Sequence, residues 1–444
     1  MSTPHIPNDA FTRELQRIRH LIGEGILPMA AKALNAAQQQ APSDPRVPLL
    51  GMRLAEKTGH TDAALAAARR ALELAPNWPV AQIETALLLA RQPQHADEAL
   101  ALARQALASE PDNVQVRTGA INVAMYASQP EQTIAWADEG VQHFPNDAGM
   151  RLFLGRFLAN QGRHAEALTH FEHMLLRVPH HAEALQGALT STLAKDGPSN
   201  LAQDYADRWL ALTPADANAQ YWHAVAYGNT PATQPPDMVG QTFARFAPQF
   251  DKHLVSGLKY RVPERTAQIL LDKYPDRQFN LLDLGCGTGL VGVYLGSIKG
   301  AIIGVDLSQP MIDEAAKHGI YAKFYRTNVL DALRETPDAH YEAITCTDVL
   351  IYVGDLTPVI PNALRILKPG GHFIFSCEAA AENEADLVLR SPSNRYAHKA
   401  SAAQRLCREA GFDEVVVEDL PALRMEGGAP VAGFLVTAHK PLTV

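Results

Sequence analysis

Six prolines recur at nearly equal spacing along the first half of the chain. The intervals between them are 34 or 35 residues, and the prolines are Pro42, Pro76, Pro111, Pro145, Pro179 and Pro214. Chance rarely produces five such intervals in succession, whereas a fixed period of about 20–50 residues is typical of repeat architectures. The spacing therefore predicts an array of similar units rather than one globular core.

Small and apolar residues recur at two fixed offsets before these prolines. Five residues upstream stand Ala37, Ala71, Ala106, Gly140, Met174 and Trp209. Twelve residues upstream stand Ala30, Ala64, Ala99, Thr133, Ala167 and Ala202. The two offsets differ by about two helical turns, so both positions lie on one face of a helix. We expect this face to let a neighbouring helix approach closely.

The repeat unit resembles the tetratricopeptide repeat (TPR). In the fifth unit, LFLGRFLANQGRHAEALTHFEHMLLRVP, the residues that carry the resemblance are Leu154, Gly155, Ala167, Phe171 and Pro179. Ala137 and Ala206 replace the usual aromatic residue elsewhere, and residues 11–41 depart further, as a cap would. The resemblance implies an all-α TPR solenoid with a concave groove. That groove binds a peptide or protein, or it serves assembly, and both interpretations stay open.

A polar, proline-rich segment at residues 229–236 interrupts the helical pattern. It has no periodic apolar residues, which is typical of a linker. The predicted organisation is a flexible N-terminus, a helical repeat domain, a linker and a second domain, at residues 1–10, 11–228, 229–239 and 240–444.

Apolar runs typical of β-strands alternate with helix-like segments in the second domain. The strand-like runs are residues 279–284, 301–305, 341–347 and 372–377, and the helix-like segments are residues 291–297, 310–317 and 356–367. This alternation predicts an α/β fold with a parallel sheet covered on both faces. Two further strand-like runs, 415–417 and 431–438, have no helix between them, so we expect an antiparallel pair that closes the sheet.

A glycine-rich loop follows the first of these strands, in the segment LLDLGCGTG at residues 281–289. Its alternating glycines, Gly285, Gly287 and Gly289, allow a tight turn and close approach of a ligand to the backbone. Asp306 ends the next strand, where a carboxylate can accept hydrogen bonds from both hydroxyls of a ribose. The loop and the carboxylate together predict a nucleoside ligand.

Charge distinguishes between two kinds of nucleoside ligand. Residues 287–292 also match the G-x-G-x-x-G pattern of dinucleotide sites, but that pattern alone is weak. Asp283, two residues before the first glycine, would repel a pyrophosphate and attract an ammonium or a sulfonium. S-adenosylmethionine carries both cations and no phosphate, so we favour it. The alternative role for Asp283 is to accept hydrogen bonds from loop amides.

The second domain resembles the class I S-adenosylmethionine-dependent methyltransferases over about residues 240–440. The resemblance rests on LLDLGCGTG, on GVDLSQPMIDEA at residues 304–315 and on LKPGGHFIFS at residues 367–376. It implies a Rossmann-like domain with a seven-stranded, mostly parallel sheet and an antiparallel last strand. The whole chain, with its phrases FDKHLVSGLKYRVPE and SNRYAH, is similar to a bacterial group of predicted repeat-containing methyltransferases.

This resemblance implies S-adenosylmethionine as cofactor and a set of cofactor contacts. The implied contacts are Asp283, Gly285, Cys286, Gly287, Asp306, Leu307, Met311, Asn328 and Val329. Asp306 would hold the ribose, and Leu307 and Met311 would flank the adenine. Asn328 stands where the family often has an acidic residue, although its side-chain oxygen can still accept from the adenine amine.

Residues that bind the methyl acceptor are expected outside the common core. The candidates for a catalytic role are His253, Asp348 and His398, and the candidates for substrate binding are Tyr260, Arg261, Tyr352, Arg395 and Tyr396. Either histidine would act as general base, or would be structural, and Asp348 would orient the acceptor. If Arg261 and Arg395 both face the pocket, we expect a carboxylate-bearing acceptor, because guanidinium pairs bidentately with carboxylate.

Composition narrows the partners and the compartment. The 444 residues carry a net charge of −9 with no basic stripe, which argues against nucleic-acid or anionic-membrane binding. No stretch approaches the ~20 apolar residues of a membrane span. The four cysteines form no C-x-x-C pair, so we expect buried free thiols, no metal site and a cytoplasmic protein.

We therefore predict a cytoplasmic S-adenosylmethionine-dependent methyltransferase (EC 2.1.1.-). It would transfer a methyl group to O or N of a peptide, a protein or a small molecule, with the TPR array serving substrate docking, a protein partner or homo-oligomer assembly. The alternative is a non-catalytic TPR interaction protein with a degenerate transferase fold. The intact glycine loop argues against that alternative. The acceptor, its reacting atom and the general base stay open.

Overall fold

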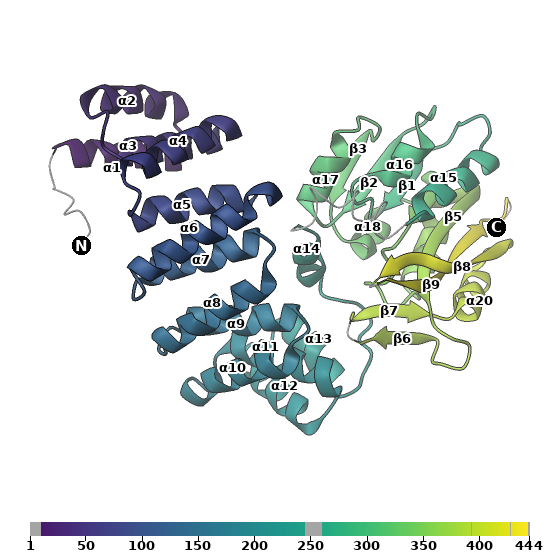
Figure 1. Ribbon diagram of the computed structural model, residues 1–444. Helices are drawn as coiled ribbons and strands as arrows, with labels where there is room; N and C mark the ends of the chain where they lie inside the picture. The colour runs from purple at the N-terminus through teal and green to yellow at the C-terminus, as the bar shows by residue number, and fades with distance from the viewer. Residues whose placement is uncertain (1–9, 245–259, 392, 427, 443–444) are drawn as a thin grey trace. The chain divides into compact units, whose positions relative to one another are not determined.

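The computed structural model describes residues 10–244, 260–391, 393–426 and 428–442, without the side chains of 241–244. The chain divides into two compact units, Met1–Lys195 and Asp196–Val444 (Figure 1). Within the described ranges, no helix combines the length and apolar character needed to cross a membrane.

The first unit consists of consecutive helices that pack against one another in pairs. Its α-helices are α1 (Ala10–Gly23), α2 (Leu27–Gln40), α3 (Arg46–Lys57), α4 (Thr61–Leu74), α5 (Pro79–Ala90), α6 (Ala96–Ser109), α7 (Val114–Tyr126), α8 (Pro130–His143), α9 (Ala148–Asn160), α10 (His164–Arg177) and α11 (Ala182–Asp196). A short 3₁₀ turn, Pro93–His95, precedes α6. This is the helical array that the proline spacing predicted.

The small-residue face predicted from the repeat offsets is buried. The residues twelve positions before the repeat prolines are fully buried at Ala30, Ala64, Ala99, Thr133, Ala167 and Ala202. Phe171 on α10 shows how closely the helices approach one another. A Cβ added to Gly155 on α9 or to Gly187 on α11 would lie 2.8 Å or 2.4 Å from its ring.

The second unit begins with the last helices of the predicted repeats, α12 (Asn200–Leu212) and α13 (Ala217–Ala226). Residues 229–235, here called the connecting segment, lead to α14 (Pro236–Ala244). The predicted linker at 229–239 remains our proposed domain boundary, although the compact unit starts earlier. The connecting segment packs on the α/β domain, where Tyr396 Oη donates to Pro231 O at 2.7 Å.

The α/β domain contains one nine-stranded sheet within the described residues. Its strands are β1 (Leu281–Leu284), β2 (Ile302–Asp306), β3 (Lys323–Arg326), β4 (Tyr341–Cys346), β5 (Leu367–Ala379), β6 (Leu387–Arg390), β7 (Arg395–His398), β8 (Val415–Glu426) and β9 (Ala429–His439). The order is β3-β2-β1-β4-β5-β7-β6, and β9 pairs antiparallel with both β5 and β8. Strands β1 to β5 pair in parallel.

The parallel centre and the antiparallel closing pair confirm the predicted fold class, but the predicted number of seven strands is wrong. The sequence analysis missed β3 and the short β6–β7 hairpin. Each of these strands has four residues and lies at or near an edge of the sheet. An edge strand needs no continuous apolar run, so its sequence gives no strong signal.

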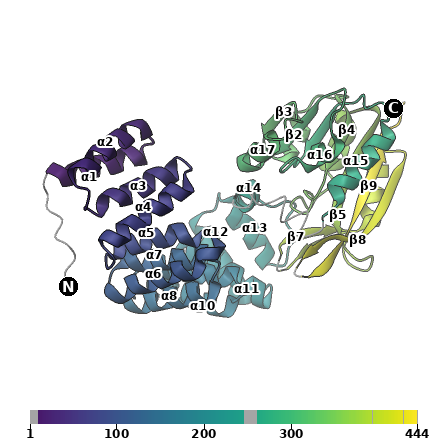
Figure 2. The same ribbon diagram turned by 45° about the horizontal axis from the view of Figure 1, so that its top comes forward.

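Helices cover both faces of the sheet, as the alternating pattern predicted (Figure 2). They are α15 (Val262–Lys273), α16 (Leu290–Leu295), α17 (Gln309–Ala316), α18 (Val329–Glu335), α19 (Val359–Ile366) and α20 (Ala400–Ala410). Leu281 lies in a core with Leu270 of α15, whereas its neighbour Leu282 lies in a separate core with Ile360 of α19. Successive residues of β1 thus point to opposite, covered faces.

Candidate active site

The glycine-rich loop, residues 285–289, joins β1 to α16 at the carboxyl end of the parallel strands. Gly285, Gly287 and Gly289 have positive φ angles of 67°, 54° and 86°, which favour glycine. A Cβ on Gly285 would also lie 2.1 Å from Cγ2 of Val349, just after β4. The loop therefore passes directly against the segment that follows β4, with no room for a side chain at Gly285.

Asp306, at the end of β2, holds this loop in place. Its carboxylate accepts hydrogen bonds from Gly287 N at 2.9 Å and from Ser308 N at 2.8 Å. Burial raises the pKa of Asp306, and the bonds from backbone N–H groups oppose that rise. A carboxylate has about four lone-pair positions, so capacity remains for the two hydroxyls of a ribose.

Asp283 lies buried at β1 and accepts from two side-chain hydroxyls. Thr345 Oγ1 donates to one carboxylate oxygen at 2.7 Å and Tyr321 Oη to the other at 2.6 Å. Burial raises the pKa of Asp283 to about 6, and the two hydroxyl donors partly counteract this. The alternative role predicted for Asp283 was bonding to loop amides, whereas the donors to its two oxygens are side-chain hydroxyls.

The sequence analysis missed Tyr321. Its hydroxyl also accepts from Gly292 N at 3.2 Å, and its ring stacks on Phe324 at 5.0 Å between centroids. It thereby connects Asp283 to the first turn of α16. A tyrosine between α17 and the weak strand β3 belongs to no motif, so only the fold reveals this contact.

The other predicted cofactor residues have mixed environments. Cys286, Met311 and Val329 are buried, while Leu307 is half-buried. Burial also raises the pKa of the Cys286 thiol well above its usual range, so this thiol stays neutral. Asn328 caps α18, where its side-chain oxygen accepts from Asp331 N at 2.8 Å. The cap explains an asparagine at this position without any ligand.

Asp348 follows β4 next to the glycine loop's contact residue, Val349. It has a positive φ of 57°, which is uncommon for a residue other than glycine and costs conformational energy. Its amide donates to Ser376 Oγ at 2.8 Å, and its carboxylate accepts from Arg424 Nη1 at 2.7 Å. Two bonds from other strands therefore maintain the strained conformation.

Arg424 belongs to a group of five charged side chains, here called the charged cluster: Asp348, Glu378, Arg395, Arg424 and Glu426. Arg424 also pairs with Glu378, and Arg395 pairs with Glu378 at 2.8 Å and with Glu426. Three members, Glu378, Arg424 and Glu426, were not predicted from the sequence, because each is a charged residue near the end of β5 or β8 that belongs to no motif. A register shift in β8 between Leu420 and Arg424 changes the pairing there and marks this position as unusual.

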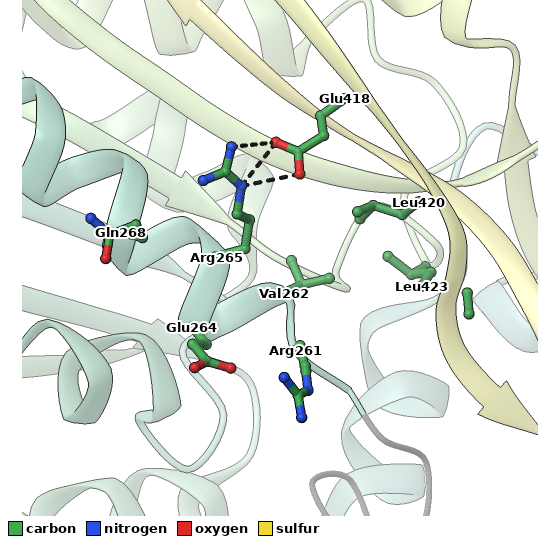
Figure 3. A pocket seen from close by; sticks show the side chains of 9 residues that line it. Arg261, Val262, Glu264, Arg265, Gln268, Glu418, Leu420 and Leu423 are labelled. Atoms are coloured by element: carbon green, nitrogen blue, oxygen red, sulfur yellow. Dashed lines mark hydrogen bonds and ion pairs between the residues drawn. The ribbon is translucent and has the colours of Figure 1, made fainter.

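These ion pairs correct the prediction for Arg395. Its guanidinium is engaged by two carboxylates and is not free to anchor an anionic acceptor. Arg261, the other predicted anchor, is exposed and lines a pocket of about 410 Å³ between α15 and β8. Figure 3 shows Arg261 apart from the paired side chains of Arg265 and Glu418, which line the same pocket. The predicted carboxylate-binding pair of arginines is therefore not supported.

Two further candidates have structural roles. Tyr396 is fully buried, and its hydroxyl bonds the connecting segment, so it is not placed as a surface for substrate. His398 is buried and donates from Nε2 to Gly354 O at 2.7 Å. Burial lowers the pKa of His398, which keeps the ring neutral. Its catalytic role is thus disfavoured, and His253 lies outside the described residues.

Tyr260 and Tyr352, both predicted to bind substrate, lie close to Asp348. The Asp348 carboxylate adds to burial in raising the pKa of each phenol. Tyr260 is buried and faces the hydroxyls of Thr347 and Ser376. The structure therefore brings three of the predicted acceptor residues together at the ends of β4 and β5.

Comparison with known proteins identifies the central part of this domain. Residues 282–375 match the family model of a methyltransferase domain. The chain is 30% identical over 156 residues to phosphoethanolamine N-methyltransferase 3 of Arabidopsis thaliana, covering 34% of this chain and 31% of that protein. It is 34% identical over 113 residues to a ubiquinone biosynthesis O-methyltransferase of Coxiella burnetii, covering 23% and 47%. The chain thus spans less than half the length of these relatives.

Two solved structures are similar to part of this chain at low identity. A Burkholderia thailandensis 1,6-didemethyltoxoflavin N1-methyltransferase, solved with S-adenosylhomocysteine, is 19% identical with a TM-score of 0.37 and covers 48% of this chain and 93% of that one. YrrB, described as a TPR protein with an unusual peptide-binding site, is 23% identical with a TM-score of 0.34 and covers 43% and 96%.

S-adenosylmethionine is the cofactor of such a methyltransferase domain, and the residues present fit it. The sequence of the loop, Gly-Cys-Gly-Thr-Gly, offers no cation for a phosphate. The two carboxylates of Asp283 and Asp306 suit a ligand with a ribose and positive charge.

Proposed function

We propose that this chain is a cytoplasmic S-adenosylmethionine-dependent methyltransferase that acts on an O or N atom of a peptide, a protein or a small molecule. The observation that carries the proposal is the glycine loop held by Asp306. The loop amides are fixed by a carboxylate that keeps capacity for ribose hydroxyls. A degenerate, non-catalytic fold would have no reason to retain this arrangement.

The bound cofactor supplies a methyl group that is already activated on a sulfonium. The enzyme then chiefly has to align the acceptor, exclude water and handle one proton. Asp306 binds the ribose, and the glycine loop admits the methionine part beside Asp283. Asp348, with Tyr260 and Tyr352 near it, is placed to orient the acceptor at the end of β4, because ligands of α/β sheets bind beyond the carboxyl ends of the strands.

We further propose that the helical array is of the TPR type and that it docks a substrate or partner or mediates assembly. The proline spacing and the buried small-residue face support the TPR type. Each unit of such an array buries its apolar face only against its neighbours, and the array's exposed surface is then available for binding.

Calorimetric titration tests the enzyme proposal against its alternatives. The full chain should bind S-adenosylmethionine and S-adenosylhomocysteine and should not bind NAD. Asp306→Asn should weaken both by about 10-fold or more, because a hydrogen bond to a charged group contributes about 1.5–3 kcal/mol. Affinity for neither cofactor would favour the scaffold alternative, and affinity for NAD alone would favour a dinucleotide enzyme.

A further inference from the structure

The charged cluster is assembled from four parts of the sheet. It includes Asp348, which with Tyr260 and Tyr352 forms what is here called the acceptor end of the site. Asp348 follows β4, Glu378 lies on β5, Arg395 on β7, and Arg424 and Glu426 on β8. The side chains of Arg424 and Glu378 are only 3% and 6% exposed, whereas that of Asp348 is 20% exposed. Asp348 is therefore the more exposed of the two carboxylates that Arg424 hydrogen-bonds, while Arg395 and Glu426 are also partly exposed, at 18% and 45%.

The cluster carries one more carboxylate than guanidinium. Arg424 lies between Asp348 and Glu378, and Arg395 lies between Glu378 and Glu426. Three carboxylates and two guanidiniums give an excess of one negative charge. Arg390, which also acts electrostatically on Glu378, has its own carboxylate partner in Glu384. Glu426, which supplies the third carboxylate, is 45% exposed and screened by water, so the charge that acts on a ligand is that of the partly exposed Asp348 carboxylate, which attracts a cation and repels an anion.

Asp348 also lies close to the cofactor loop. The adjacent residue, Val349, is the one that a Cβ on Gly285 would touch at 2.1 Å. Asp348 therefore directly precedes the residue whose side chain packs against the glycine loop. A group bound at Asp348 lies at the same carboxyl edge of the sheet as the cofactor, where acceptors bind in open α/β sheets.

A buried phenol lies beside Asp348. Tyr260 is only 3% exposed, and its hydroxyl faces those of Thr347 and Ser376 without making a hydrogen bond of ordinary geometry to either or to another described residue. A buried polar group without a partner costs free energy unless a ligand or water satisfies it. A protonated amine bound to Asp348 would have a second N–H for this oxygen, which can accept as well as donate.

We propose that Asp348 is the binding site for a protonated amine, so that the methyl acceptor of this enzyme is an amine nitrogen, and that Arg424 is the positioning residue of Asp348. This inference rests on the proposed methyltransferase function. For transfer, the ammonium gives one proton to the Asp348 carboxylate or to water. The nitrogen lone pair then forms the bond to the methyl carbon, the electron pair of the broken carbon–sulfur bond stays on sulfur, and a methylated ammonium results.

The chemistry of Asp348 suits both parts of this role. As an ionised group it binds the ammonium, and burial raises its pKa, which makes it a better proton acceptor. Arg424 opposes that rise and holds the carboxylate in its strained position after β4. An alcohol acceptor would offer the Asp348 carboxylate no positive charge.

Three cofactor analogues test the proposal by binding alone, without an identified acceptor. S-adenosylhomocysteine has a neutral sulfur, S-adenosylmethionine has a sulfonium that donates no hydrogen bond, and sinefungin has a protonated amine in place of the methyl group. Isothermal titration calorimetry of the full chain should give sinefungin an affinity at least about 10-fold above that of S-adenosylhomocysteine, a difference of about 1.4 kcal/mol.

Asp348→Asn should reduce that ratio to about one while S-adenosylhomocysteine affinity changes less than about twofold. Asp313→Asn, which alters an exposed carboxylate on α17, is the matched control and should keep the wild-type ratio. A sinefungin advantage that persists in Asp348→Asn would overturn the amine site. Equal losses for sinefungin and S-adenosylmethionine would assign Asp348 to the sulfonium instead. If none of the three ligands binds wild type, the proposed function itself fails.

Discussion

The site has a cofactor end, formed by the glycine loop with Asp283 and Asp306, and an acceptor end around Asp348. The carboxylates of the two ends are held by different kinds of hydrogen-bond donor. Asp283 and Asp306 accept hydrogen bonds from hydroxyls and backbone amides, which are neutral. Asp348 and Glu378 pair with the guanidinium of Arg424. Neutral donors fix a carboxylate and leave its charge for a ligand, whereas arginines cancel most of the charge and leave a small excess. The first arrangement suits a cationic cofactor, and the second is the one that we propose selects among acceptors.

The largest expected effect comes from removing the arginine of the acceptor end. Arg424→Met leaves Asp348 and Glu378 buried without their shared counter-charge, which should cost about 3–5 kcal/mol of unfolding free energy. Arg265→Met, which breaks the exposed pair with Glu418, should cost less than about 1 kcal/mol. Calorimetric unfolding of both variants measures the difference. Equal losses would mean that burial of the charged cluster has no energetic consequence.

The cofactor end should be most sensitive to the shape of its loop. Gly285→Ala adds a Cβ against Val349 at a positive φ, so we expect S-adenosylmethionine affinity to fall by about 100-fold or more. Gly319→Ala is the matched control, because Gly319 has a similar φ of 65° with nothing within 4 Å of the added atom. It should lower the unfolding temperature slightly and leave affinity unchanged. An equal loss of affinity in both variants would refute the steric account.

The neutral donors at the cofactor end predict a pH dependence of binding. Burial raises the pKa of Asp283 to about 6, so the carboxylate takes up a proton as the pH falls through this value. The cationic cofactor binds the ionised form better, so its affinity should be constant above pH 7 and fall about 10-fold by pH 5. Titrations from pH 5 to 8 measure this, and Asp283→Asn should flatten the curve. A wild-type curve without this fall would remove Asp283 from cofactor recognition.

The smallest effect is expected where the connecting segment joins the acceptor end. Gln234 N donates to Tyr352 O at 3.0 Å, and Asp355 N to Ala232 O at 2.8 Å, so the segment backs the loop that carries Tyr352. Tyr396→Phe removes the bond to Pro231 O and the contact of this hydroxyl with that of Tyr221, and should cost about 1 kcal/mol. A lower unfolding temperature with faster proteolysis near residue 231 would follow. Unchanged proteolysis would mean that this hydroxyl does not secure the segment.

The same comparison explains how much of the site the sequence predicted. The residues of the cofactor end lie close together in the sequence. The glycines of residues 281–289 mark the turn before α16, and Asp306 marks the end of the next strand, so each feature can be predicted from its own residues. The charged cluster joins residues 348 to 426 across strands whose neighbours are not adjacent in sequence. A single charged residue in a strand looks like a surface position, so Arg424 and Glu378 gave no signal.

The helical array and the parallel sheet could also be predicted because their signals are local in the sequence. Proline spacing and buried alanines at fixed offsets specified the helical array, and alternating apolar segments specified the parallel sheet. The sequence does not predict β6 and β7, because Leu387–Arg390 and Arg395–His398 are short and pair mainly with each other. Without that hairpin, Arg395 and Tyr396 are expected to face a substrate. In the structure, Arg395 pairs with Glu378 and Glu426, and Tyr396 bonds the connecting segment.

The most direct test of the account is a crystal structure of the full chain with S-adenosylhomocysteine. We expect both ribose hydroxyls within about 2.6–3.2 Å of the Asp306 carboxylate and the sulfur directed toward Asp348. A ligand bound away from the glycine loop, or with its sulfur directed away from the charged cluster, would contradict the division of the site into a cofactor end and an acceptor end.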